Sequence, residues 1–201
     1  MRAEAPRAAL LDFGNVLVEV DFRRAFAAWA KAAGVPVDVL AEKFSFDEAY
    51  CAHERGEIDQ VEYFLRLRDC LRIEIPDEAM LAGWNAIFGE PLPGIERVLR
   101  ELADRMPLYV FSNTNPAHVA HFGARYRELL ARVTKVVTSC DIGRRKPEPE
   151  AFLRVAALTG IAPSRLAFFD DLEENVAGAR RAGLQAWRVA RPQEILDALA
   201  R

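Results

Sequence analysis

Residues 8–15 read Ala-Ala-Leu-Leu-Asp-Phe-Gly-Asn, four apolar side chains followed at once by a carboxylate. Apolar runs without polar alternation are typical of parallel strands that are covered on both faces. We therefore predict a buried parallel strand over residues 8–11 that ends at Asp12. In an open parallel sheet, ligands bind beyond the carboxyl ends of the strands, so Asp12 lies where a binding site is expected.

Four further apolar runs have the same character, at residues 108–111, 133–138, 166–169 and 186–189. Helical periodicity separates these four runs, at residues 95–102, from Asn115-Pro116 onward, at 152–158 and at 176–182. Strands that alternate with helices form a doubly wound parallel sheet with right-handed crossovers. The sequence therefore predicts an α/β fold of this kind.

The connection between the first two strands is different, because residues 21–90 show only helical periodicity. Five helices are predicted there, over residues 22–33, 39–44, 46–52, 61–71 and 78–88. A crossover needs only about a dozen residues, so we interpret this segment as an inserted all-helical unit. The predicted division is a core of residues 1–20 and 91–201 and an insert of residues 21–90.

Polar residues follow the predicted strands, and they define the candidate site. They are Asp12, Ser112 with Asn113, Lys146, and the pair Asp170-Asp171. Crowded carboxylates repel one another unless a cation lies between them, and oxygen ligands without His or Cys favour Mg²⁺. A hydroxyl and an ammonium group are suited to a phosphoryl group, so we expect Ser112, the amide of Asn113 and Lys146 to bind it. A carboxylate can attack phosphorus to form an aspartyl-phosphate. Taken alone, Asp171 could instead cap the helix that follows it.

Composition narrows the range of partners. The 201 residues contain 27 Lys and Arg against 30 Asp and Glu, a net charge of −3, so no basic field is present for nucleic acid. No apolar stretch approaches the roughly 20 residues of a membrane span. The three cysteines lie far apart without a Cys-x-x-Cys pair, so neither a disulfide scaffold nor a structural zinc site is indicated. Asp12 interrupts the first apolar run, which is not expected of a secretory signal peptide. We expect a cytoplasmic protein without nucleic-acid or membrane partners.

The order Asp12, Ser112, Lys146, Asp170-Asp171 resembles the haloacid dehalogenase-like hydrolase superfamily across the whole chain. The resemblance implies a Rossmann-like core with a helical cap inserted after the first motif. It also implies that Asp12 is the nucleophile, Ser112 binds the phosphoryl group, Lys146 offsets its charge, and Asp171 is the main Mg²⁺ ligand with Asp170 assisting. Receiver domains use similar residues, but in that family the acidic pair precedes the phosphorylated Asp.

A narrower resemblance is to the α-glucose-1-phosphate phosphatase group. It is carried by the stretches at residues 11–17, 53–58, 112–115, 145–148 and 168–171. The segment His53-Glu54-Arg55 lies in the predicted cap, where it either lines the mouth of the site or forms a solvated helix end. The implied substrate is a small phosphorylated molecule such as glucose 1-phosphate, bound by a monomer or homodimer.

One position departs from the family pattern. Superfamily phosphatases usually have a second Asp two residues after the nucleophile, which moves protons, whereas this chain has Gly14. The Gly14 carbonyl can still ligate the metal. Either a sugar-1-phosphate leaving group needs little protonation, or a residue at the cap junction, Glu19 or Asp21, replaces the acid. Asp21 also suits the N-cap of the next helix.

Three alternatives to a phosphatase remain open at this point. Dehalogenases of the superfamily also lack the second Asp but need no metal, so the acidic pair Asp170-Asp171 favours a phosphatase. A phosphomutase would use the same core motifs. A non-catalytic protein that binds phosphorylated ligands is the third, because Gly14 cannot carry a proton.

Overall fold

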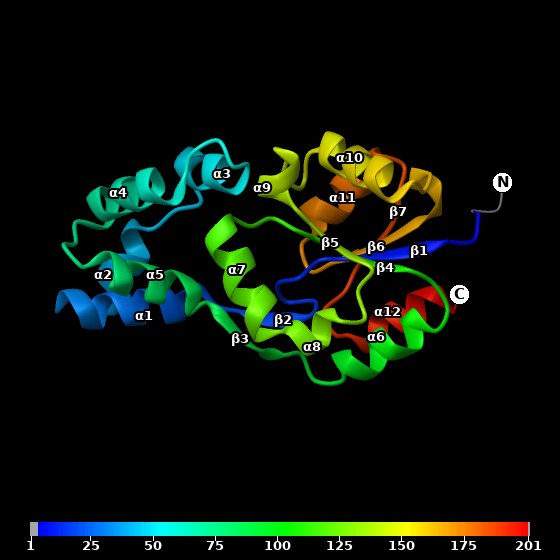
Figure 1. The fold of residues 1–201 in the computed structure, drawn as a ribbon, viewed down its shortest axis with the longest axis horizontal. Coiled ribbons are helices and arrows are strands. Elements are labelled where there is room, and N and C mark those ends of the chain that lie inside the picture. The colour runs from blue at the N-terminus through cyan, green and yellow to red at the C-terminus, as the bar shows by residue number, and fades with distance from the viewer. Residues whose placement is uncertain (1–3, 201) are drawn as a thin grey trace.

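A five-stranded parallel sheet forms the centre of the computed structural model, which describes residues 4–200 (Figure 1). The strands run in the order β5-β4-β1-β6-β7. Their bounds are β1 Ala8–Leu11, β4 Leu108–Ser112, β5 Lys135–Thr138, β6 Leu166–Asp170 and β7 Gln185–Arg188. Leu11 pairs with Val110 on one side and with Phe169 on the other, so β1 is central and Asp12 follows it between two neighbouring strands.

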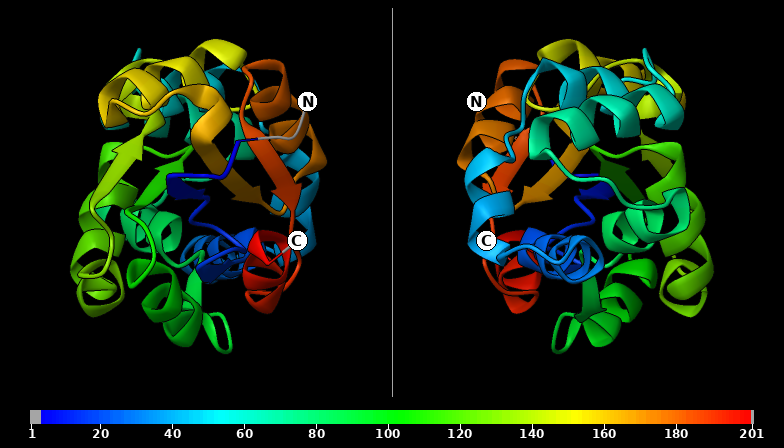
Figure 2. Two further views of the ribbon diagram at one scale, coloured as in Figure 1. Left: turned by 90° about the vertical axis from the view of Figure 1, so that its right-hand side faces the viewer. Right: turned by 90° about the vertical axis from the view of Figure 1, so that its left-hand side faces the viewer.

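Helices cover both faces of this sheet, as the two end-on views show (Figure 2). The core helices are α6 Ile95–Ala103, α7 Pro116–Arg125, α8 Arg127–Leu130, α9 Ser139–Ile142, α10 Pro149–Thr159, α11 Glu173–Arg181 and α12 Gln193–Leu199, with a 3₁₀ turn at Pro163–Arg165. Ala9 and Leu11 pack in one hydrophobic cluster with α6 and α12, whereas Ala8 and Leu10 pack in a second with α10 and α11. The uninterrupted apolar run in β1 is therefore needed because each face is buried. The α/β class with a parallel sheet is confirmed.

Residues 22–85 form five helices, which lie beyond one end of the sheet (Figure 1). They are α1 Phe22–Ala33, α2 Val37–Lys43, α3 Glu48–Glu54, α4 Gln60–Leu71 and α5 Asp77–Asn85. Trp29 and Trp84 are fully buried and stack with their ring centroids 6.2 Å apart. We refer to residues 21–87 as the helical insert, because the last three residues of the predicted 21–90 segment belong to a strand.

A short antiparallel pair of strands joins the helical insert to the core. It consists of β2 Val18–Val20 and β3 Phe88–Pro91. The prediction of a helix over 78–88 was wrong at its C-terminal end, because α5 stops at Asn85 and Phe88 pairs with Val20. Among the described residues, no helix is long and apolar enough to cross a bilayer.

Candidate functional site

The core of the site is an ammonium group that bridges two carboxylates at the carboxyl edge of the sheet. Lys146 Nζ lies 2.6 Å from Asp12 Oδ1 and 2.7 Å from Asp170 Oδ2. One carboxylate oxygen from each of Asp12, Asp170 and Asp171 falls within 4.8 Å of the others. Residues that are up to 159 positions apart in the sequence therefore meet because β1 lies between β4 and β6.

Lys146 is held in place by groups that do not touch the carboxylates. Its side chain is 1% exposed and lies over the rings of Phe111 and Phe168, with Nζ 5.5 Å from each centroid. The Asn113 side chain donates to the Lys146 carbonyl at 2.9 Å and accepts from the Lys146 N–H at 2.8 Å. We predicted Asn113 as a phosphate-binding residue, and sequence reasoning missed this side-chain contact because the two residues are 33 positions apart.

A cavity of about 410 Å³ opens above the bridged carboxylates. Its floor includes Asp12, Gly14, Ser112, Asn113 and Lys146. The helical insert and β3 supply its aromatic walls, which are Phe22, Phe46, Tyr50 and Phe88. The arrangement can therefore hold a phosphorylated group at its polar floor and a larger organic group between the aromatic walls.

Comparison with known proteins identifies the family. The model for haloacid dehalogenase-like hydrolases matches residues 6–183. The chain belongs to this family. The prediction of this superfamily, and of an enzyme of the phosphatase type, is confirmed.

Relatives of this haloacid dehalogenase-like hydrolase include named phosphatases. D-ribitol-5-phosphate phosphatase of Bacteroides thetaiotaomicron is 26% identical, covering 89% of this chain and 89% of the relative. A phosphatase of Mycobacterium tuberculosis, MT3486, is 26% identical over 96% of this chain and 92% of its own. A solved haloacid dehalogenase family enzyme of Bacteroides thetaiotaomicron, in complex with magnesium and inorganic phosphate, matches with a TM-score of 0.79 and 26% identity, covering 92% and 94% of the two chains.

The donor set of this family member fits Mg²⁺. Three carboxylates converge with no His or Cys among them, and oxygen ligands of this kind are those that Mg²⁺ prefers. Asp170 is already engaged, since it accepts hydrogen bonds from Lys146, from Asn175 at 3.0 and 3.1 Å, and from the N–H of Leu172 at 2.9 Å. The alternative role of Asp171 as a helix cap does not occur, because the N-cap of α11 is Leu172 and Asp170 accepts its N–H.

Electrostatics in the site reflect burial and close charges. Burial raises the pKa of Asp12 to about 7, although Lys146 opposes this rise. Burial, followed by repulsion from Asp170, also raises the pKa of Asp171. Burial alone would lower the pKa of Lys146, but its ion pairs with Asp12 and Asp170 outweigh burial and raise it. The raised pKa values of Asp12 and Asp171 therefore indicate that Lys146 offsets only part of the negative charge of the three carboxylates.

Of the predicted cap residues His53, Glu54 and Arg55, the structure places only Glu54 in the lining of the cavity. Glu54 lines the cavity, is 3% exposed, and pairs with Arg145, whose Nη2 lies 2.8 Å from Glu54 Oε2. His53 is buried beside Tyr63 and is not among the lining residues. Arg55 pairs with Glu48 and Glu57, away from the cavity lining.

Two groups near the cavity bear on proton transfer. Asp21 caps α1 by accepting from the Arg23 N–H at 2.9 Å, and it is not a lining residue. His118 does line the cavity, but its Nε2 lies 3.0 Å from the Trp84 carbonyl and its Nδ1 lies 3.0 Å from Asn115 Nδ2. Burial lowers the pKa of His118 to about 3, so its ring stays neutral.

Proposed function

We propose that this hydrolase is a Mg²⁺-dependent phosphatase of a small sugar-phosphate-type metabolite, such as glucose 1-phosphate, acting through an aspartyl-phosphate on Asp12. The observation that carries the proposal is the Lys146 ammonium, which bridges Asp12 and Asp170 beside a third carboxylate at the base of the cavity. The named relatives support it, since they include a ribitol-5-phosphate phosphatase. Residues 21–90 would serve as the cap over the site.

In the first step, Asp12 attacks phosphorus in line, so that an oxygen–phosphorus bond to Asp12 forms as the bond to the leaving oxygen breaks. Lys146 offsets negative charge on the phosphoryl oxygens, and the Ser112 hydroxyl orients the group. Asn113 keeps Lys146 in position through its two backbone hydrogen bonds. Asp12, Asp171 and the Gly14 carbonyl, with Asp170 assisting, would hold Mg²⁺, which supplies positive charge for the transferred group.

In the second step, water attacks phosphorus and releases Asp12. Gly14 cannot activate this water or protonate the leaving oxygen. The neutral, fully bonded His118 ring does not replace it. A sugar 1-phosphate leaves as a hemiacetal hydroxyl, which is more acidic than an ordinary alcohol and needs less protonation. To act as the alternative proton carrier, Asp21 would have to leave its N-cap contact with the Arg23 N–H, because it does not line the cavity.

The acidic cluster favours this function over a dehalogenase. A haloacid substrate carries its own carboxylate, and three convergent carboxylates would repel it unless a cation were bound. Gly14, in contrast, is the feature that favours a second candidate, a protein that binds phosphorylated ligands without turnover.

Phosphate release from a panel of sugar and nucleoside phosphates tests the proposal. We expect turnover with Mg²⁺, none with EDTA, and none with Asp12→Asn. The exposed Asp104 provides a matched control, and Asp104→Asn should retain full activity. Mg²⁺-dependent binding of phosphate without release from any ester would contradict the phosphatase and establish the binding protein.

A further inference from the structure

We propose that the ion pair of Glu54 and Arg145 makes the leaving-group part of the cavity neutral, so that the enzyme selects esters whose organic half is an uncharged polyhydroxyl group and rejects those with a second anionic group. This inference rests on the proposed phosphatase function. It names the class of substrate and the residues that set it.

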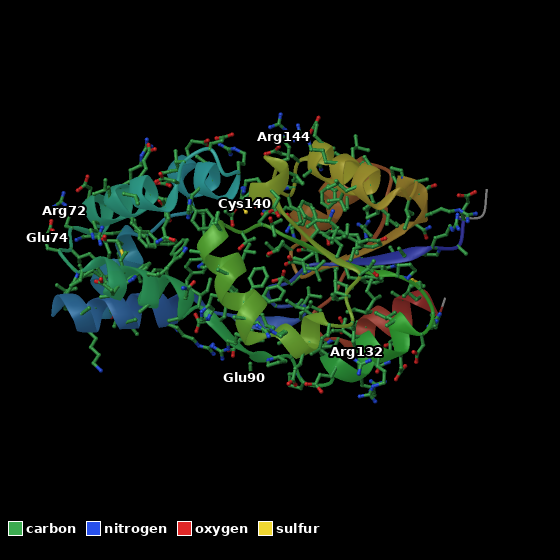
Figure 3. All side chains as sticks on the ribbon, in the orientation of Figure 1. Arg72, Glu74, Glu90, Arg132, Cys140 and Arg144 are labelled. Atoms are coloured by element: carbon green, nitrogen blue, oxygen red, sulfur yellow. The ribbon has the colours of Figure 1, made fainter. Side chains whose placement is uncertain are left out.

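The pair joins the helical insert to the core at the wall of the cavity. Glu54 is the last residue of α3, which contacts α9 of the core (Figure 1). Arg145 follows α9 and directly precedes Lys146. Glu54 Oε2 accepts from Arg145 Nε at 2.9 Å and lies 2.8 Å from Arg145 Nη2. The neighbouring Arg144 lies at the outer surface, its side chain 42% exposed, and is not a lining residue (Figure 3).

Among the described residues that line the cavity, each cationic side chain is already paired with a carboxylate, so none is free to bind a second anion. The two cations are Lys146 and Arg145, and the anions are Asp12, Glu54 and Glu174, of which only Glu174 is exposed to solvent. Lys146 is committed to Asp12 and Asp170, and Arg145 to Glu54. The other titratable residues of this lining are Tyr50 and His118, and the His118 ring is neutral.

An anion that entered this space would therefore lose water without gaining a counter-charge. Burying an unpaired charge is unfavourable in general, and the aromatic walls offer no compensating donors apart from the Tyr50 hydroxyl. A sugar or polyol escapes this cost, since its hydroxyls can donate to the Glu54 carboxylate and accept from the Arg145 guanidinium. Its C–H faces can pack on Phe22, Phe46 and Phe88.

The test compares esters that differ only in the second charge. Glucose 1-phosphate is paired with glucuronic acid 1-phosphate, and glucitol 6-phosphate with 6-phosphogluconate, because in each pair a CH₂OH group becomes a carboxylate. We expect the wild-type enzyme to favour the neutral member in kcat/KM by about tenfold or more. Glu54→Gln keeps a hydrogen-bond acceptor but frees the charge of Arg145, and it should reduce this preference by about tenfold or reverse it.

Further variants separate charge from structural damage. The double variant Glu54→Gln with Arg145→Gln restores neutrality and should restore the wild-type preference. Arg145→Gln alone leaves an excess negative charge and should strengthen the rejection of anions. Glu48 lies on the same helix in an ion pair with Arg55, with its side chain 80% exposed, so Glu48→Gln is the matched control and should change nothing.

The outcomes distinguish this inference from the proposed function. Hydrolysis of p-nitrophenyl phosphate shows which variants are still active. If all variants hydrolyse it, and the ratio of kcat/KM for neutral and anionic esters in Glu54→Gln and Arg145→Gln stays within twofold of the wild-type ratio, the role of the pair is overturned. Absence of hydrolysis of every ester by the wild type would overturn the phosphatase itself. The same ester pairs would then be compared as ligands by thermal shift with Mg²⁺, and equal shifts for neutral and anionic members would overturn the selectivity as well.

Discussion

Ser139 offers a sharp test of how the helical insert is joined to the core. Its side chain is fully buried and its hydroxyl serves two segments at once. The hydroxyl lies 2.6 Å from the Glu54 carbonyl at the end of α3, and it accepts from the Thr114 N–H at 2.8 Å. Ser139→Ala removes one oxygen and leaves both backbone groups without this partner.

The size of the effect follows from those two bonds. A buried backbone donor or acceptor left unsatisfied costs about 1–3 kcal/mol. Two such groups therefore lower the free energy of unfolding by about 2–4 kcal/mol, since part of the loss is recovered by relaxation. A domain of this size loses roughly 2–4 °C in Tm per kcal/mol, so Tm should fall by about 4–16 °C.

Urea and thermal unfolding of Ser139→Ala, followed by circular dichroism, measure this loss. Ser164→Ala is the matched control, because Ser164 is exposed and its hydroxyl makes one long contact of 3.4 Å to Glu4. A loss below about 0.5 kcal/mol for Ser139→Ala, equal to that of an ordinary surface substitution, would refute the reasoning that this hydroxyl holds the insert and the loop after β4 together.

Two further predictions concern the charges of the site. Lys146→Met should lower kcat/KM by about a hundredfold or more, because loss of one group that stabilises transition-state charge typically costs about 10²–10³ in rate. The exposed Lys135→Met should leave kcat/KM unchanged. A loss under fivefold for Lys146→Met would contradict the assigned role. In the metal-free protein the pKa of Asp12 is raised to about 7 from its ordinary 3.8, so the folded state keeps a proton that the unfolded chain releases, and stability should fall as pH rises from about 4 to 7. Mg²⁺ should therefore raise Tm more at pH 8 than at pH 5 in thermal unfolding, with the difference reduced in Asp12→Asn; an equal or larger shift at pH 5 would count against metal binding at Asp12.

The sheet could be predicted from the sequence because its signal is local. Each of the five strands is a short apolar run; the observed bounds of β1 equal the predicted ones, and those of the other four differ by at most two residues at an end. The pair β2–β3 could not be predicted in this way. Val20 and Phe88 are 68 positions apart, and Phe88 by itself also fits the end of the preceding helical pattern.

The residues of the candidate site could likewise be predicted from local sequence. Asp12, Ser112, Lys146 and the pair Asp170-Asp171 were selected because each follows a predicted strand, and the structure brings them to one edge of the sheet. The roles we assign to them remain predictions until the variants are assayed.

Partners of these residues across the chain could not be predicted. The contact of Asn113 with Lys146 and the pairing of Glu54 with Arg145 join segments 33 and 91 positions apart. A single sequence does not specify such distances, since they depend on how the strands are ordered in the sheet.

The central position of β1 also bears on how the chain acquires its structure during synthesis. Among the five strands of the sheet, β1 comes first along the chain, and it pairs with β4 and β6, whose residues follow about 100 and 160 positions later. The contacts of α1 with α2 and α5, in contrast, lie within one contiguous stretch of the chain. Because pairing of distant segments is slow, β1 stays without its two neighbours until β4 and β6 have been synthesised, and the candidate site at its carboxyl end is completed only when β6 has emerged.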